Sequence, residues 1–125
     1  MGEAIILICA AALAVDGDTI RCQDGTRIRV AGIEANEMRG GCHLPVCSSV
    51  PGRVAKAQMQ AIVGGQNLTY VPRRRTWNRI EAAVQLPDGR DLACETLRIG
   101  ITVRWDKFWP KGKVCPATQP SAAAR

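Results

Sequence analysis

The sequence predicts an α+β fold that is mainly β, with short strands and two short helices. Tight-turn motifs recur along the chain, as DGDT, QDGT and PDGR. The segments between them alternate polar and aliphatic residues, as in RIRVAGI. Only two stretches have helical spacing. With 125 residues and 46% apolar residues, the chain is expected to form one domain around one core.

The apolar run AIILICAAALA, at residues 4–14, has the length of a signal-peptide core and ends in a small-x-small pattern. No Lys or Arg precedes it. Two interpretations stay open: residues 4–14 are a signal segment, or their distal part is the first strand, behind an apolar segment at 1–8. The run is too short for a stable membrane span.

The next elements follow from turns and caps. ALAV, DGDT and TIRC form a hairpin, and RIRVAGI is the third strand. Residues 51–65 are helical and end at Gly64 and Gly65. Strands follow at 67–75 and 79–86. The helix at 91–100 is capped by Asp91 and stopped by Gly100. This order predicts a five-stranded OB-type Greek-key barrel over residues 9–109, with a loose tail at 110–125.

The composition indicates which class of partner the protein binds. A net charge of +6 and a pI near 9.3 favour a polyanion, with nucleic acid ahead of a membrane surface. One Phe and one Tyr argue against binding through an array of stacked aromatic rings. We expect a monomer with DNA or RNA as its partner.

Six cysteines in so short a chain suggest an oxidising compartment, hence export to the periplasm or the cell exterior. Metal ligands can come from CHLPVC at 42–47, but a loop closed by a disulfide is favoured. His43 is the only histidine, which excludes any site that needs two. We expect Cys42 to pair with Cys47 and Cys94 with Cys115. The pairing of the remaining two, Cys9 and Cys22, stays open.

Acidic and basic side chains gather in VDGDTIRCQDGTRIRVAGIEANE, at residues 15–37. Asp18, after a tight turn, and Glu34, at a strand end, can converge on a hard cation such as Ca²⁺, which prefers oxygen ligands. Glu37, in the following loop, can reach a water beside that ion. Arg29 lies on the same strand as Glu34, and its guanidinium suits phosphate oxygens.

The motifs VDGDTI, IRVAGIEANE and RTWNR resemble those of the staphylococcal nuclease (thermonuclease) family over roughly residues 13–106. The resemblance implies a Ca²⁺-dependent phosphodiesterase that cleaves DNA and RNA, as an endo- or exonuclease, leaving 3′-phosphate ends. By this resemblance, Asp18 and Glu34 are the metal carboxylates, and the main-chain carbonyl of Ala35 is a further ligand. Glu37 is the general base, and Arg29 and Arg79 bind the phosphate. Asp16 lies near the metal but is not bound to it.

The chain departs from the family at three neighbouring positions. Glu34 stands where Asp is usual, which keeps the charge on a longer side chain and shifts the ion by about 1 Å, a misplacement that can slow a reaction on the order of 10²-fold. Ala35 replaces a common Thr but keeps its carbonyl. Asn36 replaces the usual Pro, so we expect a looser loop around Glu37.

Two further groups concern substrate. Arg73, Arg74 and Arg75 are a solvated strand end or a track for phosphates. The three tryptophans, Trp77, Trp105 and Trp109, are expected to pack, and Trp77 beside Arg79 can also meet a base. The alternative to a nuclease is a catalytically weak OB-fold module that binds nucleic acid or a partner. The enzyme is favoured, because a pure binder has no need for Glu37 among arginines.

Overall fold

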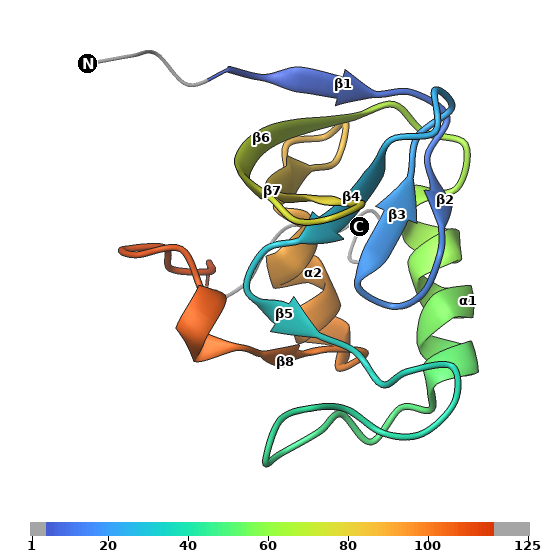
Figure 1. The fold of residues 1–125 in the computed structure, drawn as a ribbon, viewed down its shortest axis with the longest axis vertical. Helices are drawn as coiled ribbons and strands as arrows, with labels where there is room; N and C mark the ends of the chain where they lie inside the picture. The colour runs from blue at the N-terminus through green and yellow to red at the C-terminus, as the bar shows by residue number, and fades with distance from the viewer. Residues whose placement is uncertain (1–4, 117–125) are drawn as a thin grey trace.

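The computed structural model describes residues 5–116, and the elements of this part of the chain are shown in Figure 1. In chain order they are β1 (Leu7–Cys9), β2 (Leu13–Ala14), β3 (Thr19–Arg21), β4 (Arg27–Val30), β5 (Ile33–Glu34), α1 (Gly52–Val63), β6 (Leu68–Arg75), β7 (Ile80–Gln85), α2 (Leu92–Ile99), β8 (Val103–Arg104) and the 3-10 turn η1 (Asp106–Phe108). The expected α+β class, mainly β with two helices, is confirmed. Residues 117–125, most of the expected loose tail, lie outside the described residues.

Six strands form one curled sheet in the order β1-β6-β7-β4-β3-β2. Its two edge strands, β1 and β2, are halves of one chain segment, which bends at Ala11, where φ is +48°. One half pairs antiparallel with β6 and the other with β3. Because consecutive residues reach both edges, the sheet curls into a half-barrel, as Figure 1 shows. This shape is compatible with an OB-type fold.

The count of five strands is not confirmed. The expected strand at 27–33 is split, because Gly32 adopts a positive φ of 82° that no regular strand contains. β4 before the break pairs with β3 and, in parallel, with β7. β5 after it leaves the main sheet and pairs with β8, a two-residue strand that the sequence did not predict.

The helices begin and end as their sequences predict. Asp91 caps α2 by accepting a hydrogen bond from the backbone N–H of Cys94 at 2.9 Å, and Gly100 ends it in the left-handed conformation, with φ of 84°. α1 ends at Val63, directly before Gly64, and packs against β2, while α2 packs against β7. The core between sheet and helices is built of fully buried aliphatic side chains, notably Ile20, Ile28, Met59, Leu92 and Ile101.

Three disulfides cross-link the described chain. Cys42 pairs with Cys47 and Cys94 with Cys115, the two pairs suggested by the sequence, and Cys9 pairs with Cys22. The last bridge ties β1 to the end of β3. Disulfides are compatible with an exported protein. Neither α-helix of residues 5–116 combines the length and the apolar content needed to cross a membrane.

Candidate active site

The turn between β2 and β3 carries two of the predicted site residues, Asp16 and Asp18. Their chain reversal is closed by hydrogen bonds from the backbone N–H groups of Val15 and Asp16 to the carbonyl of Thr19, at 2.8 and 3.2 Å. Gly17 lies so close to its neighbours that a Cβ there would sit 2.6 Å from the Cβ of Ala35. A glycine is therefore required for the turn to reach the end of β5.

Arg29 lies between two buried carboxylates. Its Nη2 donates to Oε1 of Glu34 at 2.7 Å, and its Nη1 lies 3.5 Å from Oδ2 of Asp18. Glu34 and Asp18 are only 3% and 6% exposed. Three elements contribute to this contact: β4, β5 and the turn before β3. The structure thus brings together three residues that are spread over the sequence, the outer two, Asp18 and Glu34, being 16 positions apart.

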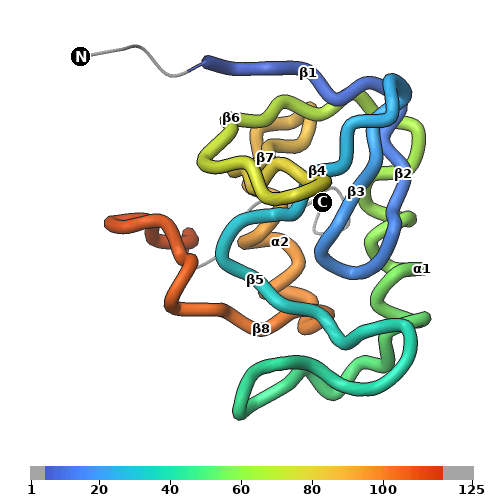
Figure 2. Tube along the Cα trace, in the orientation of Figure 1, coloured from blue at the N-terminus to red at the C-terminus, as the bar shows by residue number. Residues whose placement is uncertain are grey.

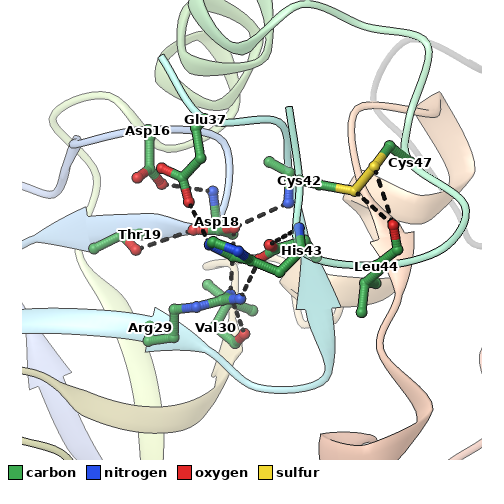
Figure 3. Close-up of polar contacts among 12 residues, drawn as sticks. Asp16, Asp18, Thr19, Arg29, Val30, Glu37, Cys42, His43, Leu44 and Cys47 are labelled. Carbon is green, nitrogen blue, oxygen red and sulfur yellow. Dashed lines mark hydrogen bonds and ion pairs between the residues drawn. A yellow bond between two sulfur atoms is a disulfide. The ribbon is translucent and has the colours of Figure 1, made fainter. Parts of the chain in front are cut away.

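The carboxylate of Asp18 is held from several sides. Its Oδ2 accepts from the backbone N–H of Ala35 at 2.9 Å, and its Oδ1 accepts from the hydroxyl of Thr19 at 3.1 Å. Its backbone N–H donates to Oδ1 of Asp16 at 3.0 Å (Figure 3). Burial, with the neighbouring side chain of Asp18, raises the pKa of Asp16 to about 6.

Glu37 lies in the loop at residues 35–51, which runs from β5 to α1 and can be followed in Figure 2. Its backbone N–H donates to the carbonyl of Gly41 at 2.9 Å. Its carbonyl touches Gly52, the first residue of α1, where any Cβ would overlap it. The side chain itself is 47% exposed, so Glu37 has a fixed backbone and a carboxylate in contact with water.

Asn36 tightens this loop, so the expectation that it loosens the loop is wrong. Its side-chain NH₂ donates to the carbonyls of Ser48 and Val50, at 2.7 and 2.6 Å. These residues lie at the far end of the loop, just before α1. The amide therefore joins both ends of the segment that carries Glu37.

His43 also lies in this loop, and its imidazole meets Glu37. The distance from Nε2 of His43 to Oε1 of Glu37 is 3.6 Å, and the backbone N–H of His43 donates to Oε2 of Glu34 at 3.3 Å. The adjacent disulfide between Cys42 and Cys47 closes the loop beside it (Figure 3). We call Asp16, Asp18, Arg29, Glu34 and Glu37 the Arg29 cluster.

Arg79 approaches the cluster from the turn between β6 and β7. Its Nη1 donates to the hydroxyl of Thr19 at 3.2 Å, and that hydroxyl in turn donates to Asp18. Between Arg79 and Arg29 lies a cleft of about 160 Å³. The aromatic side chains on its wall are Trp105, whose ring centroid lies 5.8 Å from Arg29 Cζ, and Phe108.

The three consecutive arginines predicted to contact substrate differ in their interactions. Arg74 is engaged: its Nε lies 3.2 Å from Oε1 of Glu81, and its guanidinium stacks on Phe108 at 4.5 Å. A register shift between Pro72 and Arg74 separates Arg73 from the ladder with β7, and both Arg73 and Arg75 are exposed.

The tryptophans also differ. Trp77, at the tip of the β6–β7 turn, is 96% exposed, so the expectation that it packs is wrong. Trp109 packs against the core, as expected. A Cβ at position 32 would overlap its ring, which is one reason why residue 32 is glycine.

The carboxylates of the site outnumber its arginines. The four carboxylates of the Arg29 cluster face two arginines, Arg29 and Arg79, which leaves two negative charges in excess when all four acids are ionised. Asp18 and Glu34 offer oxygen donors, which suit Ca²⁺. No buried side-chain nitrogen or oxygen within residues 5–116 lacks a hydrogen-bond partner. The fit to Ca²⁺ therefore rests on donor chemistry and charge.

Sequence reasoning missed the role of Thr19 and the proximity of His43 to Glu37. Thr19 connects Arg79 to Asp18, and His43 reaches Glu37. Thr19 had a detectable signal, since it follows Asp18 directly in the DGDT motif. His43 lies in the CHLPVC segment that the sequence offered as a possible source of metal ligands, but its contact with Glu37 could not be predicted, because the path of a loop is not encoded in residue spacing.

Comparison with known proteins adds no identification. No protein-family model matches the chain, and a search of curated proteins finds no match. The resemblance to the staphylococcal nuclease family therefore rests on the three motifs and stays a prediction.

Proposed function

We propose that this protein is a Ca²⁺-dependent nuclease of the staphylococcal nuclease type, built on an OB-type barrel, that hydrolyses phosphodiester bonds of DNA or RNA. The observation that carries the proposal is the contact of Arg29 with both Asp18 and Glu34, with Glu37 in the adjoining loop. Carboxylates in excess around an arginine are suited to a site that handles both a cation and a phosphate.

The residues divide the chemistry of hydrolysis between them. Glu37 is the proposed general base, because its carboxylate is exposed to water while its backbone is fixed. It takes a proton from the water that attacks phosphorus, and the phosphorus–oxygen bond to the leaving 5′ oxygen breaks as that oxygen takes a proton from solvent water, to which Glu37 later returns its own. Arg29 and Arg79 stabilise the negative charge that develops on the phosphoryl oxygens.

The proposed metal ligands are Asp18, Glu34 and the carbonyl of Ala35. When bound there, Ca²⁺ would supply positive charge to the phosphate and bind water. Asp16 contributes negative charge without direct ligation, since its Oδ1 accepts from the backbone of Asp18.

Substrate is proposed to lie along the cleft between Arg29 and Arg79. Its volume of about 160 Å³ and its wall of Trp105 and Phe108 suit one base beside a phosphate. Trp77, exposed at the neighbouring turn, offers a second stacking surface. A net charge of +6 supports a polyanionic substrate. Three disulfides support export as the setting.

One observation favours the alternative, a catalytically weak OB-fold binding module. Arg29 already neutralises part of both Asp18 and Glu34, as it would in a purely structural ion pair. A module of this kind would bind nucleic acid through its arginines and have no Ca²⁺ requirement.

Digestion of denatured DNA separates the two functions. We expect cleavage with Ca²⁺ and none with a calcium chelator. Glu34→Gln should abolish cleavage and Ca²⁺ dependence together, whereas Glu34→Asp should cleave at least as fast as the parent. Asp106→Asn, which removes an exposed carboxylate far along the sequence, is the matched control. Binding of DNA without cleavage in any metal would establish the alternative.

A further inference from the structure

Glu34, Glu37 and His43 bring three metal-binding atoms together: two carboxylate oxygens and one imidazole nitrogen lie within 4.8 Å of one another. We propose that these three side chains bind a transition-metal ion of the Zn²⁺ class. The donor set differs from the all-oxygen set of Asp18, Glu34 and the Ala35 carbonyl that we assign to Ca²⁺.

The backbone holds His43 over the two acids. Its N–H donates to Oε2 of Glu34 at 3.3 Å, the oxygen opposite the one that Arg29 binds. The neighbouring disulfide from Cys42 to Cys47 closes the loop around it. The imidazole therefore reaches Glu37 from a constrained position, although it is itself 72% exposed.

The spacing between His43 and Glu37 is close to that of two ligands sharing one ion. Nε2 of His43 and Oε1 of Glu37 are 3.6 Å apart. Two ligands about 2.1 Å from a common Zn²⁺ at a tetrahedral angle are separated by about 3.4 Å. The exposed side chains of Glu37 and His43 have the freedom to close the remaining gap toward Glu34.

The ligand chemistry selects the metal class. One histidine and two carboxylates, with an open position for water, suit Zn²⁺ and its neighbours among the transition metals. Ca²⁺ prefers oxygen ligands throughout, so the imidazole adds little to its affinity. His43 is thus the residue that distinguishes the two kinds of ion.

This site has a consequence for activity, which rests on the proposed function. Glu34 is a proposed Ca²⁺ ligand and Glu37 the proposed base, so an ion of the Zn²⁺ class engages both. Zn²⁺ should therefore inhibit Ca²⁺-supported cleavage, with inhibition relieved by excess Ca²⁺.

A direct binding experiment tests the site without reference to activity. Because the chain has one histidine, the imidazole resonances of untagged ¹⁵N-labelled protein report on His43 alone. Titration with ZnCl₂ should shift them at a stoichiometry of one, and calorimetry should give the matching affinity. His43→Ala should weaken Zn²⁺ binding by more than about 100-fold, beyond the range seen when only a supporting residue of a metal site is lost.

Controls separate the site from general binding by acids. Glu37→Gln should also weaken Zn²⁺ binding, whereas Asp106→Asn should bind as the parent does. His43→Gln keeps a polar side chain of similar size, in case the alanine variant folds poorly. Unshifted imidazole resonances in saturating Zn²⁺, or equal affinities in the parent and His43→Gln, would overturn the proposal.

Activity is then a separate readout. Each variant's inhibition by Zn²⁺ is measured relative to its own rate in Ca²⁺, and His43→Gln should require more than about 100-fold more Zn²⁺ for half inhibition. If Zn²⁺ shifts His43 in a protein that cleaves nothing, the metal site stands and the nuclease proposal fails. If cleavage is Ca²⁺-dependent but Zn²⁺ leaves the His43 resonances unshifted, the nuclease proposal stands and the Zn²⁺ site fails.

Discussion

The Arg29 cluster and a second ionic cluster beside α2 have opposite arrangements. In the second, which we call the Glu95 cluster, one buried carboxylate lies between two arginines. Glu95 Oε2 is 3.0 Å from Arg90 Nη1 and 2.6 Å from Arg98 Nη2, and Arg90 also pairs with Asp88 at 2.8 Å. Its two acids are therefore matched by two arginines, whereas the Arg29 cluster has acids in excess.

We propose that the Glu95 cluster serves the fold and the Arg29 cluster serves the proposed function. A charge-matched cluster can be complete without any ligand, and the Glu95 cluster fastens the turn at 87–90 to α2. Excess negative charge is unfavourable by itself, and in the Arg29 cluster burial, followed by the hydrogen bond and the charge of Asp18, raises the pKa of Asp16. We infer that changes in the Arg29 cluster act on cleavage and changes in the Glu95 cluster act on folding.

The largest expected effect is that of removing Glu37, the proposed general base. Glu37→Gln should lower the turnover number by about 10²- to 10⁴-fold, because a neutral amide cannot accept the proton of water. The melting temperature should stay unchanged, since the side chain is 47% exposed. The matched control from the other cluster is Asp88→Asn, where 50% of the side chain is exposed. A Gln variant with parental turnover would remove Glu37 from the mechanism.

Loss of Arg79 should come next. Arg79→Ala removes charge from the developing transition state and should lower turnover by about 10²- to 10³-fold. The Ca²⁺ concentration for half-maximal rate should not move, because Arg79 reaches the proposed metal carboxylate only through Thr19. Initial rates against Ca²⁺ concentration measure both quantities. A displaced Ca²⁺ midpoint with normal maximal rate would contradict this division of roles.

A substitution in the Glu95 cluster should lower stability and leave cleavage unchanged. Glu95→Gln leaves the guanidinium of Arg90, 17% exposed, without its buried partner. Breaking a buried pair in this way lowers the free energy of unfolding by about 3 kcal/mol. Urea unfolding measures the loss, and cleavage per folded molecule should equal that of the parent. Reduced cleavage at unchanged stability would mean that the two clusters do not differ as described.

The smallest effect is expected when the glycine of either Asp-Gly turn is replaced. One of these turns carries residues of the Arg29 cluster and the other carries residues of the Glu95 cluster. Gly17→Ala places a Cβ 2.6 Å from that of Ala35 and should lower stability by about 1–3 kcal/mol while displacing Asp16 and Asp18. Gly89→Ala meets open space but a φ of 91°, which costs about 1 kcal/mol. Only the first should reduce cleavage per folded molecule. Equal losses of activity in both variants would show that turn strain, not crowding, matters.

How much the sequence predicted depended on how local each feature is. The cap at Asp91 and the stop at Gly100 are decided within a few residues, and both lie where the sequence placed them. The breaks at Ala11 and Gly32 depend on partners far along the chain. Gly32, for example, lies against Trp109, a contact that no pattern around residue 32 reveals.

The candidate site divides in the same way. Arg29 and Glu34 were expected on one strand, but their contact depends on the break at Gly32, which places them on β4 and β5. The approach of Asp18 to Ala35 depends instead on Gly17 packing against the end of β5. The position of His43 depends on how the loop at residues 35–51 closes, and its proximity to Glu37 appears only in three dimensions.

The bend at Ala11 imposes an order of events on folding. Because β2 pairs with β3, a few residues ahead, that edge can form as a local hairpin. β1 must wait for β6, since Leu7 pairs with Tyr70. Contacts of such long sequence separation form slowly. Until then Ile6 and Ile8, which stay more than 60% exposed even in the native state, present an unpaired apolar edge. The chain is therefore most vulnerable to aggregation after its hairpins have formed and before its first strand is in place.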